Sequence, residues 1–479
     1  MPQSPVVREA CWGRRDADDK NWFLEFVSLL AIADEVRVPG GADDPVRTLL
    51  CVFLSVFSVS LCWLFLRRSA NCYDDSMTDD ARISLPPPSP LAHHWDLDPE
   101  ITFLNHGSFG ACPRAVLAHQ AELRRQMEAE PVRFFVRELA PLLHEAREEL
   151  AAFLSADPEG LAFVNNATTG VNTVLASLPI GPGDEVLVTN HEYPACRNAL
   201  DATAARAGAT VVVADIPFPL ASVEEASEAI LAKVTSRTRL ALLDHITSQT
   251  AMVLPIETLI EKLEHRGIHV FIDGAHAPGM IDLKINDLGA SFYTGNCHKW
   301  LCAPKGAAFL WVREDHRKAI RPLVISHGAT APLDQYTRFR LEFDWVGTGD
   351  PTPYLSVPSA IATVEGMVEG GWPEIRRRNH NLALRARDLM CEALEINSPC
   401  PDSMIGSMAA VPICDGSPDP PTSPLYNDPL QDSLLFDSSI EVPVIPWPAP
   451  PHRLVRISSQ LYNTEAQYRL LANILAEFT

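Results

Sequence analysis

The sequence predicts an α/β protein with a large, mostly parallel seven-stranded sheet domain and a smaller C-terminal α/β domain. Short apolar runs alternate with helical patterns between about residues 115 and 315. Continuous apolar strands separated by helices are typical of a parallel sheet that is covered on both faces. A second block, from about residue 350 to the end, has its own helical patterns and an apolar strand near the C terminus.

Seven apolar runs are the predicted strands of the large sheet. Helical patterns over Leu139 to Phe153 and Ala226 to Lys233 lie before and between them. Ligands bind such sheets outside the carboxyl ends of the strands, and the motifs described below fall at those ends. The strands are expected at Leu161 to Val164, Glu185 to Val188, Thr210 to Val213, Leu240 to Leu243, His269 to Ile272, Ser291 to Tyr293 and Ala307 to Val312.

A chain of 479 residues is too long for one simple core, so several domains are expected. The predicted division is an N-terminal extension (1–76), a lead-in segment (77–114), a large domain (115–349) and a small domain (350–479). The small domain is expected to contain helices at Ser359 to Gly370 and Glu374 to Leu394, a Pro-rich region from Pro399 to Pro424, and a strand at Arg453 to Ser458.

The N-terminal extension contains an uncharged apolar segment, 49–66, followed by Arg67 and Arg68. Such a segment is long enough to span a bilayer as a helix. Two interpretations stay open: a membrane anchor on a soluble enzyme, or a non-native extension ahead of a true start at Met77. The first places the protein at a membrane and the second in the cytoplasm. The Pro-rich stretch 86–90 predicts a flexible lead-in.

Composition narrows the classes of ligand. A net charge of −22 argues against nucleic acid, whose phosphates require a basic surface. A phosphorylated cofactor needs only a local pocket and is not excluded. The eleven cysteines are an odd number without the spacing of a metal site. Reduced thiols in a reducing compartment are therefore expected, and no metal site is predicted.

Two strand ends carry the residues that pyridoxal 5′-phosphate (PLP) chemistry requires. One apolar run ends at Asp273, and the next is followed by His298, Lys299 and Trp300. A lysine can form a Schiff base with the cofactor, and an aspartate can keep the pyridine nitrogen protonated. His276 lies three residues after the aspartate and could approach the ring or its phenolic oxygen. Each residue alone has a plainer interpretation, such as a surface lysine or a turn aspartate.

Further candidates lie at other strand ends and loops. Asn165 to Asn172 opens a helix with small residues, and Thr168 or Thr169 could bind phosphate there. Tyr193 could stack on a planar ring. Arg456 could bind a carboxylate in two-point fashion. The plainer alternatives are a threonine cap, a tyrosine in a surface turn and a structurally paired arginine. No glycine fingerprint for a nucleotide is present, which disfavours an NAD-dependent enzyme.

Together these segments resemble the class V aminotransferase family of fold-type I PLP enzymes, and within it the isopenicillin N epimerase-like branch. The resemblance extends from about Phe103 to the end of the chain. It is carried by the segments Phe103 to Gly110, Asn166 to Asn172, Asp273 to Gly279, Gly295 to Trp300, Gly347 to Asp350 and Val455 to Ser458.

The resemblance implies a role for each candidate residue. Lys299 would be the Schiff-base lysine, and Asp273 would pair with the pyridine nitrogen. Cofactor contacts are implied for His276 near the ring, for Tyr193 as the stacking residue, and for Ala167, Thr168 and His298 at the phosphate. Thr348 would reach the phosphate of a neighbouring subunit's cofactor, because the family's active sites form at a homodimer interface. Arg456 would bind the substrate carboxylate.

The resemblance implies an enzyme that acts at the α-carbon of an amino acid, as an aminotransferase or an epimerase. Related cysteine desulfurases carry a nucleophilic cysteine in a mobile loop and a histidine at the stacking position. Cys400 and Cys414 do not match that loop, and Tyr193 replaces the histidine, so sulfur transfer is disfavoured. A cysteine desulfurase or C–S lyase remains an alternative. A further alternative, a non-catalytic membrane-tethered scaffold, would be expected to lack the lysine or the aspartate.

Overall fold

The computed structural model describes residues 84–333, 336–419 and 428–478. The extension 1–76 and its apolar segment 49–66 lie outside these ranges, so the two interpretations of that segment stay as predictions. Within the described ranges, no helix combines the length and the hydropathy that a bilayer span requires.

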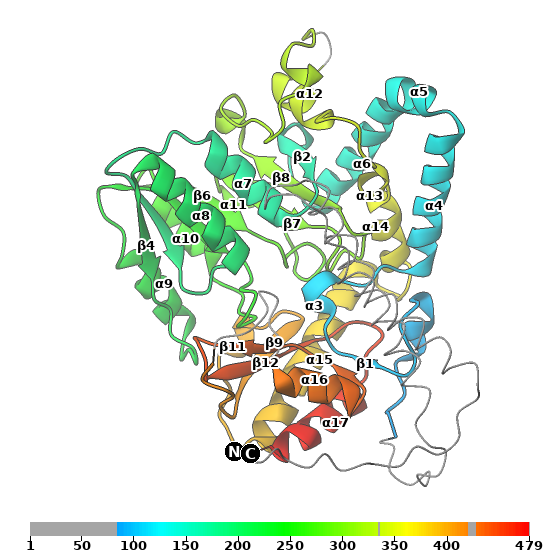
Figure 1. Cartoon of the computed structure of the whole chain (residues 1–479), viewed down its shortest axis with the longest axis vertical. Helices are drawn as coiled ribbons and strands as arrows, with labels where there is room; N and C mark the ends of the chain where they lie inside the picture. The colour runs from blue at the N-terminus through cyan, green and yellow to red at the C-terminus, as the bar shows by residue number, and fades with distance from the viewer. Residues whose placement is uncertain (1–83, 334–335, 420–427, 479) are drawn as a thin grey trace, which may run out of the picture. The chain divides into compact units, whose positions relative to one another are not determined.

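One seven-stranded sheet lies at the centre of the part of the chain predicted to be the large domain, as the apolar runs predict (Figure 1). Neighbouring strands are parallel except for β8, which runs antiparallel to both β2 and β7. In spatial order the strands are β2 (Leu161–Val164), β8 (Ala308–Val312), β7 (Phe292–Asn296), β6 (His269–Asp273), β5 (Thr238–Asp244), β3 (Glu185–Thr189) and β4 (Thr210–Ala214).

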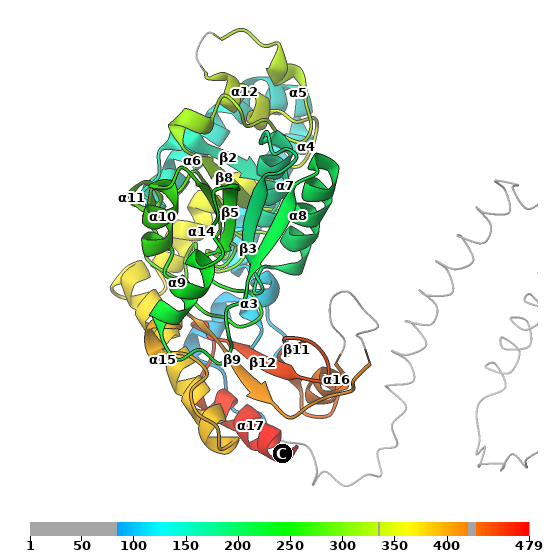
Figure 2. The same ribbon diagram turned by 90° about the vertical axis from the view of Figure 1, so that its left-hand side faces the viewer.

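Alternating side chains let this sheet bury both faces. In β5, Leu240 and Leu242 pack in one apolar cluster, whereas Ala241 and Leu243 pack in the other, because successive strand residues point to opposite faces. The first cluster includes residues of α7 (Ala167–Ser177), α8 (Pro194–Ala207) and α12 (Arg338–Asp344). The second includes residues of α6 (Leu139–Phe153), α9 (Val223–Leu231), α10 (Ile256–Glu264), α11 (Ile285–Leu288) and α14 (Val357–Glu365). Figures 1 and 2 show this layered arrangement.

The C-terminal part of the chain contains a three-stranded antiparallel sheet in which β12 is central. Its middle strand agrees with the predicted strand, but β9 lies inside the region predicted only as Pro-rich. Pro412 is tolerated there because β9 is an edge strand of this sheet. The elements are α15 (Gly371–Ala393), β9 (Met408–Ile413), α16 (Pro429–Phe436), β10 (Ile440–Glu441), β11 (Val444–Pro446), β12 (Arg453–Ser458) and α17 (Glu465–Ala476).

The described part of the lead-in segment is held by the C-terminal part of the chain and differs from the flexible lead-in predicted. The Ser89 N–H donates to the Tyr462 carbonyl, and the Thr464 hydroxyl donates to the Pro87 carbonyl. A short strand, β1 (Thr102–Phe103), pairs in parallel with β10. The next helices are α3 (His106–Phe109), α4 (Arg114–Ala129) and α5 (Pro131–Arg133), and α13 (Thr352–Leu355) precedes α14.

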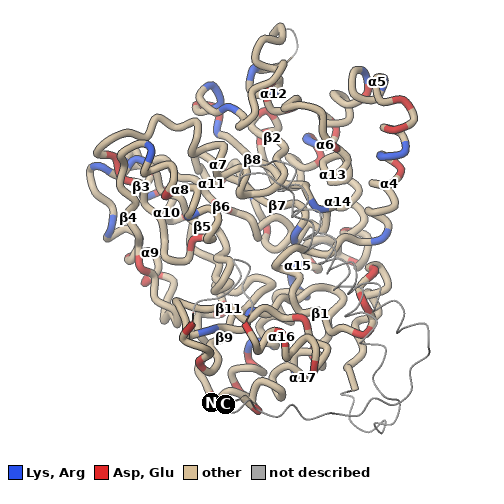
Figure 3. Tube along the Cα trace, viewed as in Figure 1, with Lys and Arg blue, Asp and Glu red and all other residues tan. Residues whose placement is uncertain are grey.

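Charged residues are dispersed over the described chain. Figure 3 shows acidic and basic residues interspersed on both the large and the C-terminal parts, without a continuous basic stripe along the described elements. The pattern agrees with an acidic protein whose charge is spread over many of its elements.

Candidate active site

Lys299 lies in the turn that follows β7, at the edge where the parallel strands end. A residue near the start of the described chain contacts its backbone: His106 Nε2 lies 3.1 Å from the Lys299 carbonyl oxygen. Gly110 approaches the same turn with a φ of +73°, and a Cβ there would lie 2.1 Å from the His298 carbonyl oxygen. Glycine is therefore required at this position, both for its conformation and for space.

The Lys299 side chain faces His276 across the site. Its Nζ atom lies 3.1 Å from His276 Nε2. Burial of the amine and then the positive charge of Arg456 lower the pKa of Lys299 to about 7, against an opposing effect of Asp273. A large fraction of the amine is therefore neutral near physiological pH, which is the form that attacks an aldehyde carbon.

Asp273 is the last residue of β6 and is almost completely buried. Its Oδ1 atom accepts the Ala275 N–H at 2.9 Å, and its Oδ2 atom accepts the Cys196 thiol at 3.2 Å. Burial raises the pKa of the carboxyl, whereas these donors and Lys299 oppose the increase. A buried carboxylate at a strand end needs a cationic partner, and a protonated pyridine nitrogen would supply one.

His276 is buried between Lys299 and Trp300. The Trp300 indole N–H donates to His276 Nδ1 at 3.4 Å. Burial and then the charges of Lys299 and Arg456 lower the pKa of His276 well below its ordinary value, so the ring is neutral. Because its Nδ1 atom accepts from the indole, the remaining proton lies on Nε2 and points toward Lys299.

The start of α7 lies beside the end of β7, as a phosphate site would require. Asn166 caps the helix by accepting the Thr169 N–H, and the Ala167 N–H donates to Asn296 Oδ1 at 2.9 Å. Thr168 lies between these two fixed positions. Burial lowers the pKa of His298 to about 4, and its Nδ1 atom lies 3.0 Å from the Ala307 carbonyl oxygen. The Ala167 N–H is already bonded to protein, so Thr168 is the stronger phosphate candidate of the predicted pair.

Two predicted cofactor residues lie at more exposed positions. Tyr193 is the N-cap residue of α8, is 39% exposed, and lies one helical turn before Cys196. Thr348 is exposed in the segment between α12 and α13. Its predicted contact requires a second subunit, so this role stays a prediction.

Arg456 reaches the site from β12 in the C-terminal sheet and is 4% exposed. Its Nη1 atom donates to the Ser248 carbonyl at 2.6 Å, and its Nη2 atom donates to the Ser108 hydroxyl at 2.8 Å. These contacts join α3, the loop after β5 and β12 around one guanidinium. The group also lowers the pKa values of Lys299 and His276, which places it within electrostatic reach of both.

Several neighbouring residues of this site were not identified from the sequence. His106 and Ser108 belong to a segment that carried the family resemblance, but no residue there was given a role. Glu192 lies one residue before Tyr193, and Cys196 lies three residues after it on the first turn of α8. Ser248 carried no sequence signal.

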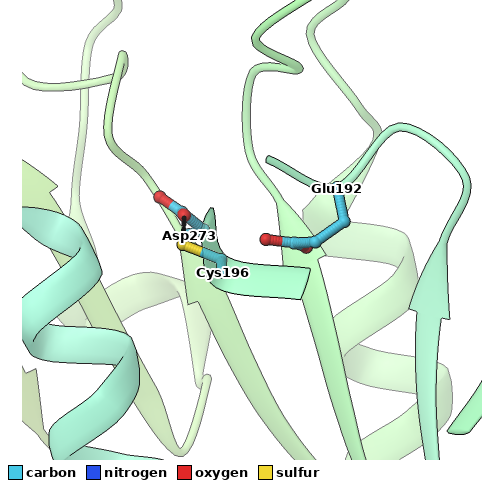
Figure 4. Close-up of side chains that lie close together, drawn as sticks. All are labelled: Glu192, Cys196 and Asp273. Carbon is cyan, nitrogen blue, oxygen red and sulfur yellow. Dashed lines mark hydrogen bonds between the residues drawn. The ribbon is translucent and has the colours of Figure 1, made fainter. Parts of the chain in front are cut away.

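Glu192, Cys196 and Asp273 form one buried group (Figure 4). One ligand atom from each lies within 4.8 Å of the other two, and Glu192 points its carboxyl toward the other side chains. This donor set could hold a metal ion, although no metal site is predicted from the sequence. Asp273 has a competing predicted role opposite the pyridine nitrogen, and Cys196 already donates to it.

The residues present fit PLP. A largely neutral lysine amine, a buried carboxyl, a capped helix N terminus and a buried guanidinium converge at the carboxyl edge of one sheet. The unsatisfied charge of the buried Asp273 is the feature that the pyridinium nitrogen would neutralise, and the lysine would bond to the cofactor's aldehyde carbon.

Comparison with known proteins gives the family. The sequence model of the Aminotransferase class-V family matches residues 104–403. The chain is 37% identical over 397 residues to isopenicillin N epimerase of Amycolatopsis lactamdurans, covering 80% of this chain and 96% of that protein. It is 31% identical over 410 residues to a probable chloroplastic L-cysteine desulfhydrase of Arabidopsis thaliana, covering 81% and 84% of the two chains.

A similar fold occurs in a solved structure of a C-DES mutant with glycine covalently linked to the PLP cofactor. The TM-score is 0.68 at 21% sequence identity, and the match covers 81% of this chain and 99% of that one. The predicted fold class, the epimerase-like resemblance and the PLP cofactor are thereby confirmed. The chain belongs to the class V aminotransferase family.

Proposed function

We propose that this protein removes the α-proton of an amino acid and returns a proton to the opposite face, as an isopenicillin N epimerase-like enzyme. The observation that carries the proposal is the position of the Lys299 amine, which contacts His276 and lies within electrostatic reach of both Asp273 and Arg456. The similarity to isopenicillin N epimerase over 80% of the chain supports this choice of reaction.

Bound PLP would supply the electron sink that accepts charge from the α-carbon. Lys299 and Asp273 would hold it at its aldehyde carbon and its pyridine nitrogen, with His276 near the ring and Thr168 and His298 at the phosphate. Arg456 would exchange its serine contacts for the substrate carboxylate, which a guanidinium binds in two-point geometry. The amine of Lys299 would then take the α-proton, and its lowered pKa makes it a base near neutral pH.

A second candidate is a C–S lyase, because the same α-proton removal can lead to loss of a β-substituent. The similarity to the probable L-cysteine desulfhydrase favours it. A desulfurase is less favoured, since it needs a reactive cysteine near the carboxylate site. Of the two cysteines in the corresponding region, Cys400 is buried with a pKa raised to about 11, and Cys414 accepts from Arg453. A non-catalytic scaffold is disfavoured because the lysine and aspartate are both retained.

The decisive experiment incubates the purified protein with PLP and a panel of L-amino acids, including L-cysteine, in deuterium oxide. Epimerisation predicts deuterium at the α-carbon together with the D-enantiomer. A lyase predicts sulfide and a keto acid from L-cysteine, and transamination predicts a keto acid with aminated cofactor. Failure of every amino acid to exchange its α-proton would contradict the proposal.

We also propose a homodimer in the cytoplasm. Thr348 lies on an exposed segment where it could reach a second subunit, and the seven cysteines of the described ranges are free thiols, as in a reducing compartment. Sedimentation of the full chain would test the assembly. Membrane contact is proposed only if segment 49–66 is a genuine anchor, which fractionation of cells producing the full chain, or the chain from Met77, would test.

A further inference from the structure

The ring-nitrogen end of the site contains more acidic groups than one cation can balance. Asp244 ends β5 and is the direct cross-strand partner of Asp273 on β6. Glu192 reaches the same region from the residue pair that precedes α8, with an oxygen within 4.8 Å of Asp273 and Cys196 (Figure 4). All three carboxyl groups are nearly inaccessible to solvent, with exposed fractions of 2% to 5%.

Glu192 is the least satisfied member of this group. Neither of its carboxyl oxygens has a hydrogen-bond partner among the described residues, and the same is true of Asp244 Oδ2. Asp273, in contrast, accepts one hydrogen bond at each oxygen, from Ala275 and from Cys196. A buried carboxylate without a partner is very unfavourable, so such a group keeps its proton instead.

A count of the charges at this end of the site also indicates that Glu192 is neutral and Asp273 is the charged carboxylate. One protonated ring nitrogen balances one carboxylate, and Asp273 is the carboxyl whose oxygens are already supplied with donors. Burial, followed by the charges of Asp244 and Asp273, raises the pKa of Glu192 well above its ordinary value, against the opposing effects of the Tyr193 backbone N–H and then of Arg197. Burial and then Asp273 likewise raise the pKa of the Cys196 thiol, which therefore keeps its proton and remains a donor.

We propose that Glu192, held as the neutral acid, is a positioning residue that acts through Asp273. Its protonated carboxyl, one oxygen of which lies within 4.8 Å of Asp273, would turn to donate to the Asp273 carboxylate beside the Cys196 thiol, which already does so. A donor to a carboxylate stabilises the charged form and lowers its basicity. The shared proton consequently stays on the ring nitrogen and does not return to Asp273, which keeps the ring an effective electron acceptor. This inference rests on the proposed function.

Three variants separate this role from a structural one. Glu192→Gln keeps a neutral donor of the same shape, whereas Glu192→Leu keeps the size and removes the donor. We expect Glu192→Gln to retain kcat within about 3-fold, and Glu192→Leu to lower kcat roughly 10- to 100-fold with KM changed less than about 3-fold, as for loss of a hydrogen bond to a charged group. Cys196→Ser should resemble the wild type, since a hydroxyl donates where the thiol did.

A measurement without cofactor tests the protonation state directly. A carboxyl whose pKa is raised by folding stabilises the protein below its ordinary pKa and loses that contribution as the pH rises. The unfolding midpoint of the cofactor-free wild type should therefore fall relative to that of Glu192→Gln between about pH 5 and pH 8. The visible absorption of the PLP-bound proteins should be the same for wild type and Glu192→Gln at each pH, and altered in Glu192→Leu.

Three results would overturn the proposal. Glu192→Gln could lose as much activity as Glu192→Leu, which would show that the negative charge matters. The cofactor-free wild type and Glu192→Gln could show parallel pH dependence, which would show that Glu192 ionises normally. Stoichiometric zinc in purified protein, lost in Glu192→Gln, would make the group a metal site. If no amino acid reacts, the proposed function fails, but the unfolding and absorption measurements still decide the role of Glu192.

Discussion

The two ends of the active site differ in charge. At the ring-nitrogen end, Asp273 is surrounded by buried acids and weak donors, and Cys196 contacts it. At the substrate end, Arg456 and Lys299 provide positive charge beside a neutral His276. The difference indicates how one site could provide both an acidic environment for the ring nitrogen and a basic environment for the lysine. In the proposed function the acidic end would favour a protonated ring nitrogen, and burial together with Arg456 at the basic end lowers the pKa of Lys299 so that its amine could act as a base.

Removing the amine should have the largest effect, because it abolishes the reactive group at the basic end. We expect Lys299→Ala to lower kcat by on the order of 10⁴-fold or more, since the variant lacks both the proposed covalent link and the proposed base. The visible absorption of the covalently held cofactor should disappear as well. Lys262→Ala on α10, far from the strand ends, is the control and should behave as the wild type. Full activity in Lys299→Ala would contradict the proposal that Lys299 is the functional group of the basic end.

Neutralising Asp273 should break the acidic end while leaving the basic end intact. Asp273→Asn removes the proposed partner of the ring nitrogen, and we expect kcat to fall roughly 10²- to 10⁴-fold, the range typical of a lost proton-transfer or proton-holding group. The matched change Asp244→Asn, on the adjacent strand, should lower kcat only a few-fold, because burial and then the charge of Asp273 raise the pKa of Asp244 well above its ordinary value and so favour its neutral form. Steady-state kinetics of both variants would test this. Equal decreases in kcat would contradict the assignment of different roles to Asp273 and Asp244.

Arg456→Gln should weaken the basic end in two ways. The KM for the amino acid should rise about 10- to 100-fold, because hydrogen bonds to a charged group are worth about 1.5–3 kcal/mol. The pKa of Lys299 should also rise from about 7, because the arginine charge lowers it. The rate at which cofactor-free protein captures PLP should therefore reach half its maximum near pH 7 in the wild type and at higher pH in the variant.

The control for this experiment lies on the same strand. Arg453 pairs with Asp428 at 2.6 Å and lies outside the site. Arg453→Gln should leave both the KM and the pH dependence of PLP capture unchanged. A rise in KM without any shift in the capture profile would mean that Arg456 binds substrate but does not tune the lysine.

The smallest expected effect concerns the proton of His276. Trp300→Phe removes the indole donor at Nδ1, so the imidazole can change tautomer and lose its donor toward Lys299. We expect kcat to fall about 2- to 10-fold, the net value of one neutral hydrogen bond. The control is Trp311→Phe, which removes a buried indole N–H that has no partner among the described residues. Equal effects in both variants would assign the loss to packing.

Periodicity and apolar runs were sufficient to predict the main sheet. The predicted strands at 161–164 and 453–458 agree with β2 and β12 in both bounds, and the helix over Leu139 to Phe153 agrees with α6. Other helix boundaries differ from the predicted ones where a capping residue fixes the end of the helix. The helix predicted from Ala226 begins at Val223, because the Ser222 hydroxyl accepts the Glu225 N–H and fixes the start.

The missed features depend on contacts between distant residues. β1 and β10 are two residues each, and neither carries a pattern until the other is placed beside it. The same holds for His106, Ser108 and Ser248, whose partners lie far away in the sequence. Lys299, Asp273 and Arg456 could be chosen because each lies on or after an apolar strand, where few polar residues occur. Glu192 and Cys196 could not, because a helix start is an ordinary place for polar side chains.

The contact between His106 and the Lys299 carbonyl has a consequence for biosynthesis. The Tyr462 hydroxyl lies 2.8 Å from the same imidazole, so segments from both ends of the described chain meet at the backbone of Lys299. Almost the whole polypeptide must be synthesised before His106, Lys299 and Tyr462 can come together. We therefore expect PLP to be captured late in maturation, and nascent chains that stop short of Tyr462 should bind the aldehyde poorly even though Lys299 has already been synthesised.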